Sequence, residues 1–127
     1  MNVVDSSGWI EYVVDGPNSD FFAEPIEASD ELIVPTISIL EVFRWILRER
    51  GEADALQAAA LMQQGEVVEL DAAIATAAAK LGLTHKLPLA DSVMLATAQT
   101  FDATLWTQDA DFEGLPGVQY RAKQPKS

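Results

Sequence analysis

The sequence predicts an α/β/α sandwich with a mainly parallel sheet of four to five strands. Short apolar segments of strand type alternate with longer segments of helical periodicity, which is typical of α/β proteins. The strand segments are apolar on both faces, as expected when helices cover both sides of a parallel sheet. The length of 127 residues suits one domain spanning 1–127, and a hydrophobic fraction of 49% is enough for a core.

The first half of the chain contains two predicted strands, each followed by two helices. We expect Ser6 or Ser7 to cap the first helix and a hydroxyl at position 36 or 38 to cap the third. Pro25 weakens the later turns of the second helix. The third helix is apolar around most of its circumference, which indicates deep burial or a subunit interface. These elements are strand 2–5, helix 9–14, helix 19–28, strand 31–35, helix 36–49 and helix 52–64.

The second half continues the alternation. Asp71 is expected to cap an alanine-rich helix that ends at Gly82, which places His85 in the following loop. Residues 121–127 are expected to form a flexible tail. The predicted elements are strand 66–70, helix 72–81, helix 91–100, strand 104–107 and edge strand 118–120.

The composition excludes several kinds of site and location. Without cysteine there is no disulfide, zinc–thiolate or iron–sulfur site, and a single histidine cannot form a multi-histidine metal site. The N-terminus lacks the features of a signal peptide, and no apolar run approaches the ~20 residues of a membrane span, so we expect a cytoplasmic protein without membrane contact. The formal charge of −12, taken alone, argues against nonspecific nucleic-acid binding and favours a metal or a basic partner.

Four segments far apart in the sequence each offer an acidic residue at the same predicted rim of the sheet. Asp5 ends the first strand, Glu41 lies about one turn into the third helix, Asp91 begins a later helix, and Asp109 follows the fourth strand. In open parallel sheets, sites gather at the carboxyl ends of the strands, so we expect these side chains to converge. Converging carboxylates repel one another unless they take up protons or bind a cation. An all-oxygen set favours Mg²⁺ or Mn²⁺, and such an ion can activate a water for attack on a phosphodiester.

Four short motifs together resemble the PIN-domain ribonucleases, and among them the VapC-type toxins of type II toxin–antitoxin systems. The motifs are Val4-Asp5-Ser6-Ser7, Ser38-x-x-Glu41, Leu89-Ala90-Asp91-Ser92 and Thr107-Gln108-Asp109-Ala110-Asp111-Phe112. They cover nearly the whole chain in the family's order and spacing.

The resemblance implies a set of site residues. The catalytic and metal-binding positions are Asp5, Glu41, Asp91 and Asp109, with Ser7, Thr107 and Asp111 in supporting roles. It further implies a Mg²⁺-dependent endoribonuclease toxin, in which Mn²⁺ can replace Mg²⁺, that cleaves structured RNA such as tRNA or rRNA. The expected partners are a second copy of the chain and a cognate antitoxin that neutralises the toxin. Arg44, Trp45 and Arg48, on the Glu41 helix, are our candidates for contact with RNA or antitoxin.

Three alternatives compete with this interpretation. The chain can be a non-catalytic PIN scaffold that only binds a protein partner, with its acids serving as helix caps and turn residues. A phosphotransfer domain of receiver type would need an acidic neighbour beside Asp5 and a lysine after the last strand, and neither is present. A phosphatase of the haloacid-dehalogenase type would need an aspartate two residues after Asp5, where Ser7 stands.

Overall fold

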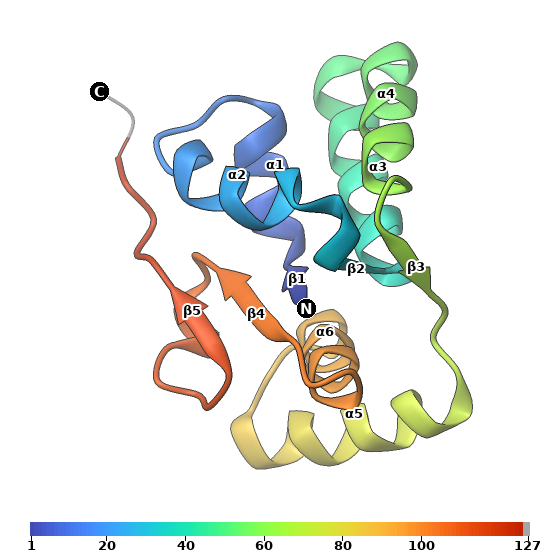
Figure 1. Cartoon of the computed structure of the whole chain (residues 1–127), viewed down its shortest axis with the longest axis vertical. Coiled ribbons are helices and arrows are strands. Elements are labelled where there is room, and N and C mark those ends of the chain that lie inside the picture. The colour runs from blue at the N-terminus through green and yellow to red at the C-terminus, as the bar shows by residue number, and fades with distance from the viewer. Residues whose placement is uncertain (126–127) are drawn as a thin grey trace.

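The computed structural model describes residues 1–125 and contains one five-stranded sheet in which every pairing is parallel. The strand order is β3-β2-β1-β4-β5, so the connections run to one side of β1 first and to the other side afterwards (Figure 1). The strands are β1 (Asn2–Val4), β2 (Leu32–Pro35), β3 (Glu66–Val68), β4 (Thr104–Thr107) and β5 (Val118–Tyr120). The point between β1 and β4 where the order reverses is the place where open parallel sheets form a binding crevice.

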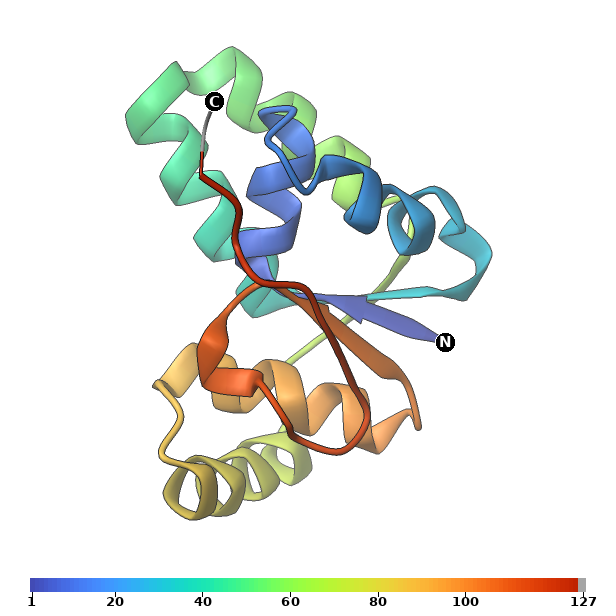
Figure 2. The same cartoon turned by 90° about the vertical axis from the view of Figure 1, so that its left-hand side faces the viewer.

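Six α-helices cover the two faces of the sheet, which confirms the predicted α/β/α class. The first four lie on one face and the last two on the other (Figure 2). The helices are α1 (Ser6–Val13), α2 (Ser19–Glu27), α3 (Thr36–Arg50), α4 (Glu52–Met62), α5 (Ala72–His85) and α6 (Leu89–Thr100), with 3₁₀ turns at Ser29–Glu31 and Ala110–Phe112. No helix within residues 1–125 is long and apolar enough to cross a membrane.

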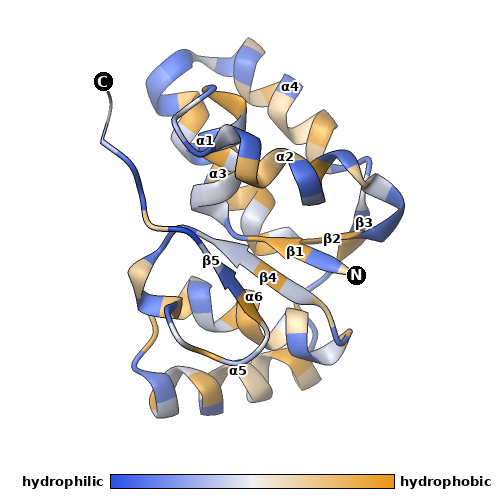
Figure 3. Cartoon of the chain, turned by 60° about the vertical axis from the view of Figure 1, so that its left-hand side comes forward, coloured by the Kyte–Doolittle hydropathy of each residue, from blue (hydrophilic) through white to orange (hydrophobic). Residues whose placement is uncertain are grey.

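The sheet separates two hydrophobic cores. Because successive side chains of a strand point to opposite faces, Val4 and Val34 pack with α1 to α4, whereas Val3, Ile33 and Leu105 pack mainly against α6. All five side chains are fully buried. Figure 3 shows that strands β1 and β2 are largely hydrophobic, whereas the edge strand β5 is more hydrophilic. Burial on both faces holds the strands in place. It therefore also sets the positions of the residues at their carboxyl ends.

Two of the predicted helix caps are wrong. Ser6 is already inside α1, and Asp5 caps this helix by accepting a hydrogen bond from the Gly8 amide at 2.9 Å. The residue before α3 is Pro35, whose extended backbone ends β2, and no side chain caps that helix. The Asp71 cap of α5 is confirmed, because its carboxylate accepts from the Ile74 amide at 2.8 Å.

The helix α5 does not end at Gly82, as predicted, but continues through His85, which is therefore helical. A Cβ at Gly82 would lie 2.5 Å from Ser92 Oγ on α6, so this glycine permits the close approach of the two helices. The chain leaves α5 at Lys86, which has left-handed backbone angles (φ 57°, ψ 46°).

Residues Arg121 and Ala122, at the start of the tail predicted at 121–127, are docked. The Arg121 amide donates to the Thr107 carbonyl at 3.1 Å, and Asn18 Nδ2 donates to the Ala122 carbonyl at 3.0 Å. These bonds extend the β4–β5 pairing and tie the segment to the start of α2. The prediction of a flexible tail is thus wrong for these residues, while 126–127 lie outside the described part of the chain.

Candidate active site

Asp5 sits at the carboxyl end of the central strand β1 and is only 2% exposed. Its carboxylate accepts hydrogen bonds from Thr107 Oγ1 at 2.7 Å, from Ser7 Oγ at 2.9 Å and from the Gly8 amide. The β1–β4 register pairs Val4 with Trp106, which brings Thr107 beside Asp5. Strand pairing and the start of α1 therefore fix the orientation of this carboxylate together.

The environment of Asp5 raises the pKa of its carboxyl group to about 6. Burial is the main cause, because the ionised form loses its hydration, and the negative charge of Asp109 adds to it. The hydrogen bonds from Thr107, Ser7 and Gly8 act in the opposite direction and limit the rise. A cation close to this carboxylate would favour its ionised form and so oppose the rise.

Glu41 enters the same region from the second turn of α3. Its Oε1 accepts a hydrogen bond from Ser6 Oγ at 2.7 Å, which connects α3 to the start of α1. The sequence singled out Ser6 only as a helix cap, so this role was missed. A small hydroxyl residue next to a predicted catalytic aspartate was the one available signal.

Asp91 lies in the first turn of α6 and is half-buried. Its pKa is raised to about 7, first by desolvation and then by the negative charges of the other acids. In decreasing order, the contributing charges are those of Asp109, Asp5, Glu41 and Asp111. Carboxylates from three other parts of the chain therefore act on Asp91.

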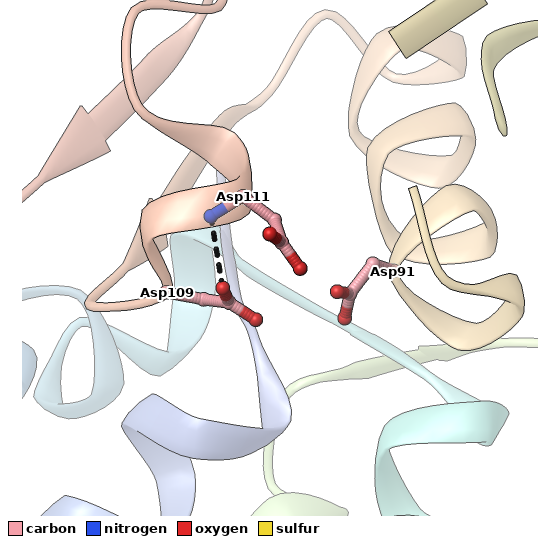
Figure 4. A group of neighbouring side chains, drawn as sticks. All are labelled: Asp91, Asp109 and Asp111. Carbon is pink, nitrogen blue, oxygen red and sulfur yellow. Dashed lines mark hydrogen bonds between the residues drawn. The ribbon is translucent and has the colours of Figure 1, made fainter. Parts of the chain in front are cut away.

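Asp109 and Asp111 lie on the turn that follows β4. The Asp109 amide donates to Thr107 Oγ1, and its Oδ1 accepts from the Asp111 amide, both at 2.9 Å. Carboxylate oxygens of Asp91, Asp109 and Asp111 lie within 4.8 Å of one another and point to a common centre (Figure 4). This spacing allows one cation to contact all three.

The four acids predicted from the sequence line one cavity of about 270 Å³, together with Trp45. The complete lining is Asp5, Ser6, Ser7, Ile10, Glu41, Trp45, Asp91 and Asp109. Arg44 and Arg48 do not line it. Both are exposed, and Arg48 lies 3.6 Å from its neighbour Glu49, an exposed pairing of little energetic weight.

The donors of this cavity fit a hard divalent cation. They are all oxygens, which Mg²⁺ and Mn²⁺ prefer, and the protein supplies no nitrogen or sulfur ligand among them. Burial and neighbouring negative charges raise the pKa values of Asp5 and Asp91, and a bound cation would neutralise that charge.

Behind the cavity lies a polar pair that the sequence did not predict. Asn18 is 1% exposed, and its Nδ2 donates to Gln108 Oε1 at 3.1 Å as well as to the Ala122 carbonyl. Its backbone amide donates to Glu11 Oε2 at 2.8 Å. Asn18 follows Gly-Pro in the sequence, a pattern that signals a turn and gives no hint of contacts about 100 residues away.

Comparison with known proteins agrees with this geometry. The family model of the PIN domain matches residues 3–118. The chain belongs to the PIN domain family. The family resemblance predicted from the motifs is confirmed, and the receiver and phosphatase alternatives are set aside. No curated protein matches the sequence.

Several solved structures share this PIN fold. A toxin–antitoxin complex from Klebsiella pneumoniae is 25% identical, with a TM-score of 0.76, over 94% of this chain and 96% of that chain. VapC20 of Mycobacterium tuberculosis, a toxin that cleaves the sarcin–ricin loop, is 15% identical, with a TM-score of 0.77, over 91% and 95%. FitAcB of Neisseria gonorrhoeae is 18% identical, with a TM-score of 0.68, over 94% and 96%. The similar structures thus include VapC toxins and toxin–antitoxin complexes.

Proposed function

We propose that this PIN domain is a VapC-type, Mg²⁺-dependent endoribonuclease that cleaves structured RNA, such as tRNA or rRNA. The observation that supports the proposal most strongly is the charge around Asp91. Burial raises the pKa of Asp91 to about 7, and the negative charges of Asp109, Asp5, Glu41 and Asp111 add to the rise. Ionised carboxylates that lie this close repel one another, and a bound cation removes the repulsion, so such clusters are typical of cation sites. Carboxylates with shifted pKa values are also common at catalytic centres.

The residues divide into ligands and positioning groups. Asp5, Glu41, Asp91 and Asp109 would hold a divalent cation, and Asp111, whose carboxylate lies with those of Asp91 and Asp109, would support it. A bound cation would neutralise charge at the scissile phosphate and lower the pKa of a water molecule for attack. Ser7 and Thr107 orient the Asp5 carboxylate through their hydroxyl hydrogen bonds, as Ser6 orients Glu41. Rigid placement of this kind is what stabilisation of a highly charged transition state needs.

The test is cleavage of bulk tRNA and rRNA by the purified protein. We expect discrete fragments with Mg²⁺ or Mn²⁺, none with EDTA, and none from Asp5→Asn, which removes a buried charge while keeping the shape of the side chain. Asp30→Asn is the matched control, because Asp30 is exposed and precedes β2, at the opposite rim of the sheet.

Two outcomes would contradict the proposal. Full cleavage by a folded Asp5→Asn protein would overturn the assignment of a metal site to this carboxylate. A folded protein that cleaves no RNA with either metal would favour the non-catalytic scaffold that binds a partner.

We also propose a cognate antitoxin and a second copy of the chain as partners. The toxin–antitoxin complexes among the similar structures support the first. A hollow of about 750 Å³ between α2 and α4 supports a basic segment in that antitoxin, because it is lined by Asp15, Asp20, Glu27 and Asp54 against one cation, Arg50. Trp45, on the wall of the active-site cavity, remains our candidate for contact with RNA or antitoxin, as do Arg44 and Arg48 on the exposed side of α3.

A further inference from the structure

We propose that Lys123 binds a backbone phosphate of the RNA next to the carboxylate cavity, and that Asn18 positions it there. The inference deepens the proposed function and rests on it. It concerns the segment after the last strand, which carries a cation to the rim of a strongly acidic site.

Three contacts hold the start of this segment in place. The Arg121 amide bonds to the end of β4, and its guanidinium lies 4.6 Å from the centre of the Phe21 ring and 3.5 Å from the Asp20 carboxylate. The Ala122 carbonyl then accepts from Asn18 Nδ2 at 3.0 Å. Backbone, stacking and side-chain contacts therefore fix the chain immediately before Lys123.

Lys123 lines a second cavity of about 320 Å³, with Ser7, Gln108, Asp109 and Ala110. Ser7 and Asp109 also line the cavity of the catalytic acids, so the two cavities adjoin along these residues. An RNA strand whose scissile phosphate lies at the acids has a neighbouring phosphate within reach of this second cavity.

The charge of Lys123 is available for such a phosphate. Among residues 1–125 the ion pairs are Arg48 with Glu49 and Arg121 with Asp20, so Lys123 has no carboxylate within 4.0 Å. Its side chain is exposed, and among the described residues 1–125 it is the one cation that lines either cavity. A site rich in carboxylates repels the polyanion it must bind, and a fixed cation at its edge offsets that repulsion.

Asn18 is the group that connects Lys123 to the active site. Its buried amide gives one hydrogen bond to Gln108, on a wall of the second cavity, and one to Ala122, the residue before Lys123. The amide thus ties two walls of the cavity together. It touches neither the catalytic acids nor the expected position of the RNA, so it is a positioning residue.

The experiment measures binding of a fluorescein-labelled single-stranded RNA by anisotropy at several salt concentrations. All variants are made in the Asp5→Asn protein, so that the probe is not cleaved. Loss of one phosphate contact lowers the slope of log K against log salt by about 0.7, which is about fivefold weaker binding at 0.1 M salt. We expect this loss for Lys123→Ala and near-normal binding for Lys123→Arg, which keeps the charge.

Two further variants distinguish the positioning of Lys123 by Asn18 from the loss of any one positive charge and from unfolding. Lys80→Ala is the matched control, because it removes the same charge from the exposed side of α5. Asn18→Ala should weaken binding about as much as Lys123→Ala, and the double variant no further, because one acts through the other. Melting curves check that Asn18→Ala is folded, and Lys123→Ala tests the contact without altering a buried residue.

The outcomes distinguish this inference from the proposed function. Three results would overturn the phosphate contact. Lys123→Ala could bind the RNA as tightly as its parent, Lys80→Ala could lose as much affinity as Lys123→Ala, or the parent could show no detectable binding. If the Lys123 effect is present but the protein with Asp5 intact cleaves no RNA, the contact stands and the nuclease proposal fails. In an active protein, Lys123→Ala should raise KM about fivefold with little change in kcat.

Discussion

At the scale of single residues, Asp5 and Asp91 predict how stability depends on pH without metal. An unfolded aspartate has a pKa near 3.9, whereas the folded values are about 6 and about 7, so the folded state holds more protons between these limits. The stabilisation is therefore complete below about pH 4 and is lost as pH rises through 6 and 7. We expect Tm in EDTA to fall between pH 5 and pH 8, with buried Asp5 contributing on the order of 1 kcal/mol, or about 3–5 °C.

Two variants check the origin of this fall. Asp91→Asn should remove the part of the fall centred near pH 7, because the amide cannot ionise, and should leave the part that Asp5 causes near pH 6. His85→Gln should leave the profile in place, because His85 lies at the end of α5 and does not line the carboxylate cavity. A Tm that rises from pH 5 to pH 8 in EDTA would contradict the assigned directions.

The same two carboxyl groups link protons to metal binding. A cation binds the ionised forms, so its binding displaces protons that Asp5 and Asp91 hold below pH 6 to 7. Millimolar Mg²⁺ should therefore raise Tm more at pH 8 than at pH 5.5, and Asp91→Asn should reduce the gain at pH 8. Equal gains at both pH values would place the ion away from these carboxylates.

At the scale of elements, local sequence patterns predicted where strands and helices lie. The residues at which they begin and end depend more on contacts with distant parts of the chain. The strands at 104–107 and 118–120 have the predicted bounds, because β-branched and apolar residues flanked by turn residues define them locally. The start of α1 was ambiguous, since Asp5, Ser6 and Ser7 are all good caps. The docking of Ala122 depends on Asn18, about 100 residues away, and no local pattern contains this contact.

The same division explains how much of the site was predictable. Asp5, Glu41, Asp91 and Asp109 follow from the rule that sites form at the carboxyl ends of parallel strands. The structure does bring them to one cavity, although their catalytic roles stay predictions until cleavage is measured. Lys123 and Asn18 were missed because their importance lies in the path of the chain after β5, which the sequence does not encode locally.

The α5–α6 contact provides a test at this scale. In an exposed helix, Gly→Ala stabilises by up to about 1 kcal/mol, yet a Cβ at Gly82 would lie 2.5 Å from Ser92 Oγ and 3.3 Å from Ser92 Cβ. Overpacking of this kind costs about 1–3 kcal/mol, so Gly82→Ala should lower Tm by several degrees. Adding Ser92→Ala should recover part of the loss. A higher Tm for Gly82→Ala would show that the helices separate easily.

At the scale of the whole molecule, charge and exposed apolar surface point to assembly. Twenty acidic residues against eight basic ones leave few cations for RNA, so binding must depend on the placement of individual cations more than on a general field. The α3 helix, expected to be buried or in an interface, exposes Leu40 at 56% and Leu47 at 44% while it buries Val42 and Ile46. Apolar side chains on the outer side of a packed helix are typical of subunit contacts.

The proposed homodimer can therefore be tested at this surface. Leu40 and Leu47 are seven residues apart, hence on the same side of α3, and Leu40 adjoins Glu41 of the active-site cavity. Sedimentation of the purified protein should show a dimer, and Leu40→Asp with Leu47→Asp should give a folded monomer, because a charge in an apolar contact is costly to bury. Phe101→Ser, at the end of α6 near the opposite rim of the sheet, should remain dimeric. A monomer at every concentration would refute the dimer, whereas a dimer that survives both leucine substitutions would place its interface on another face.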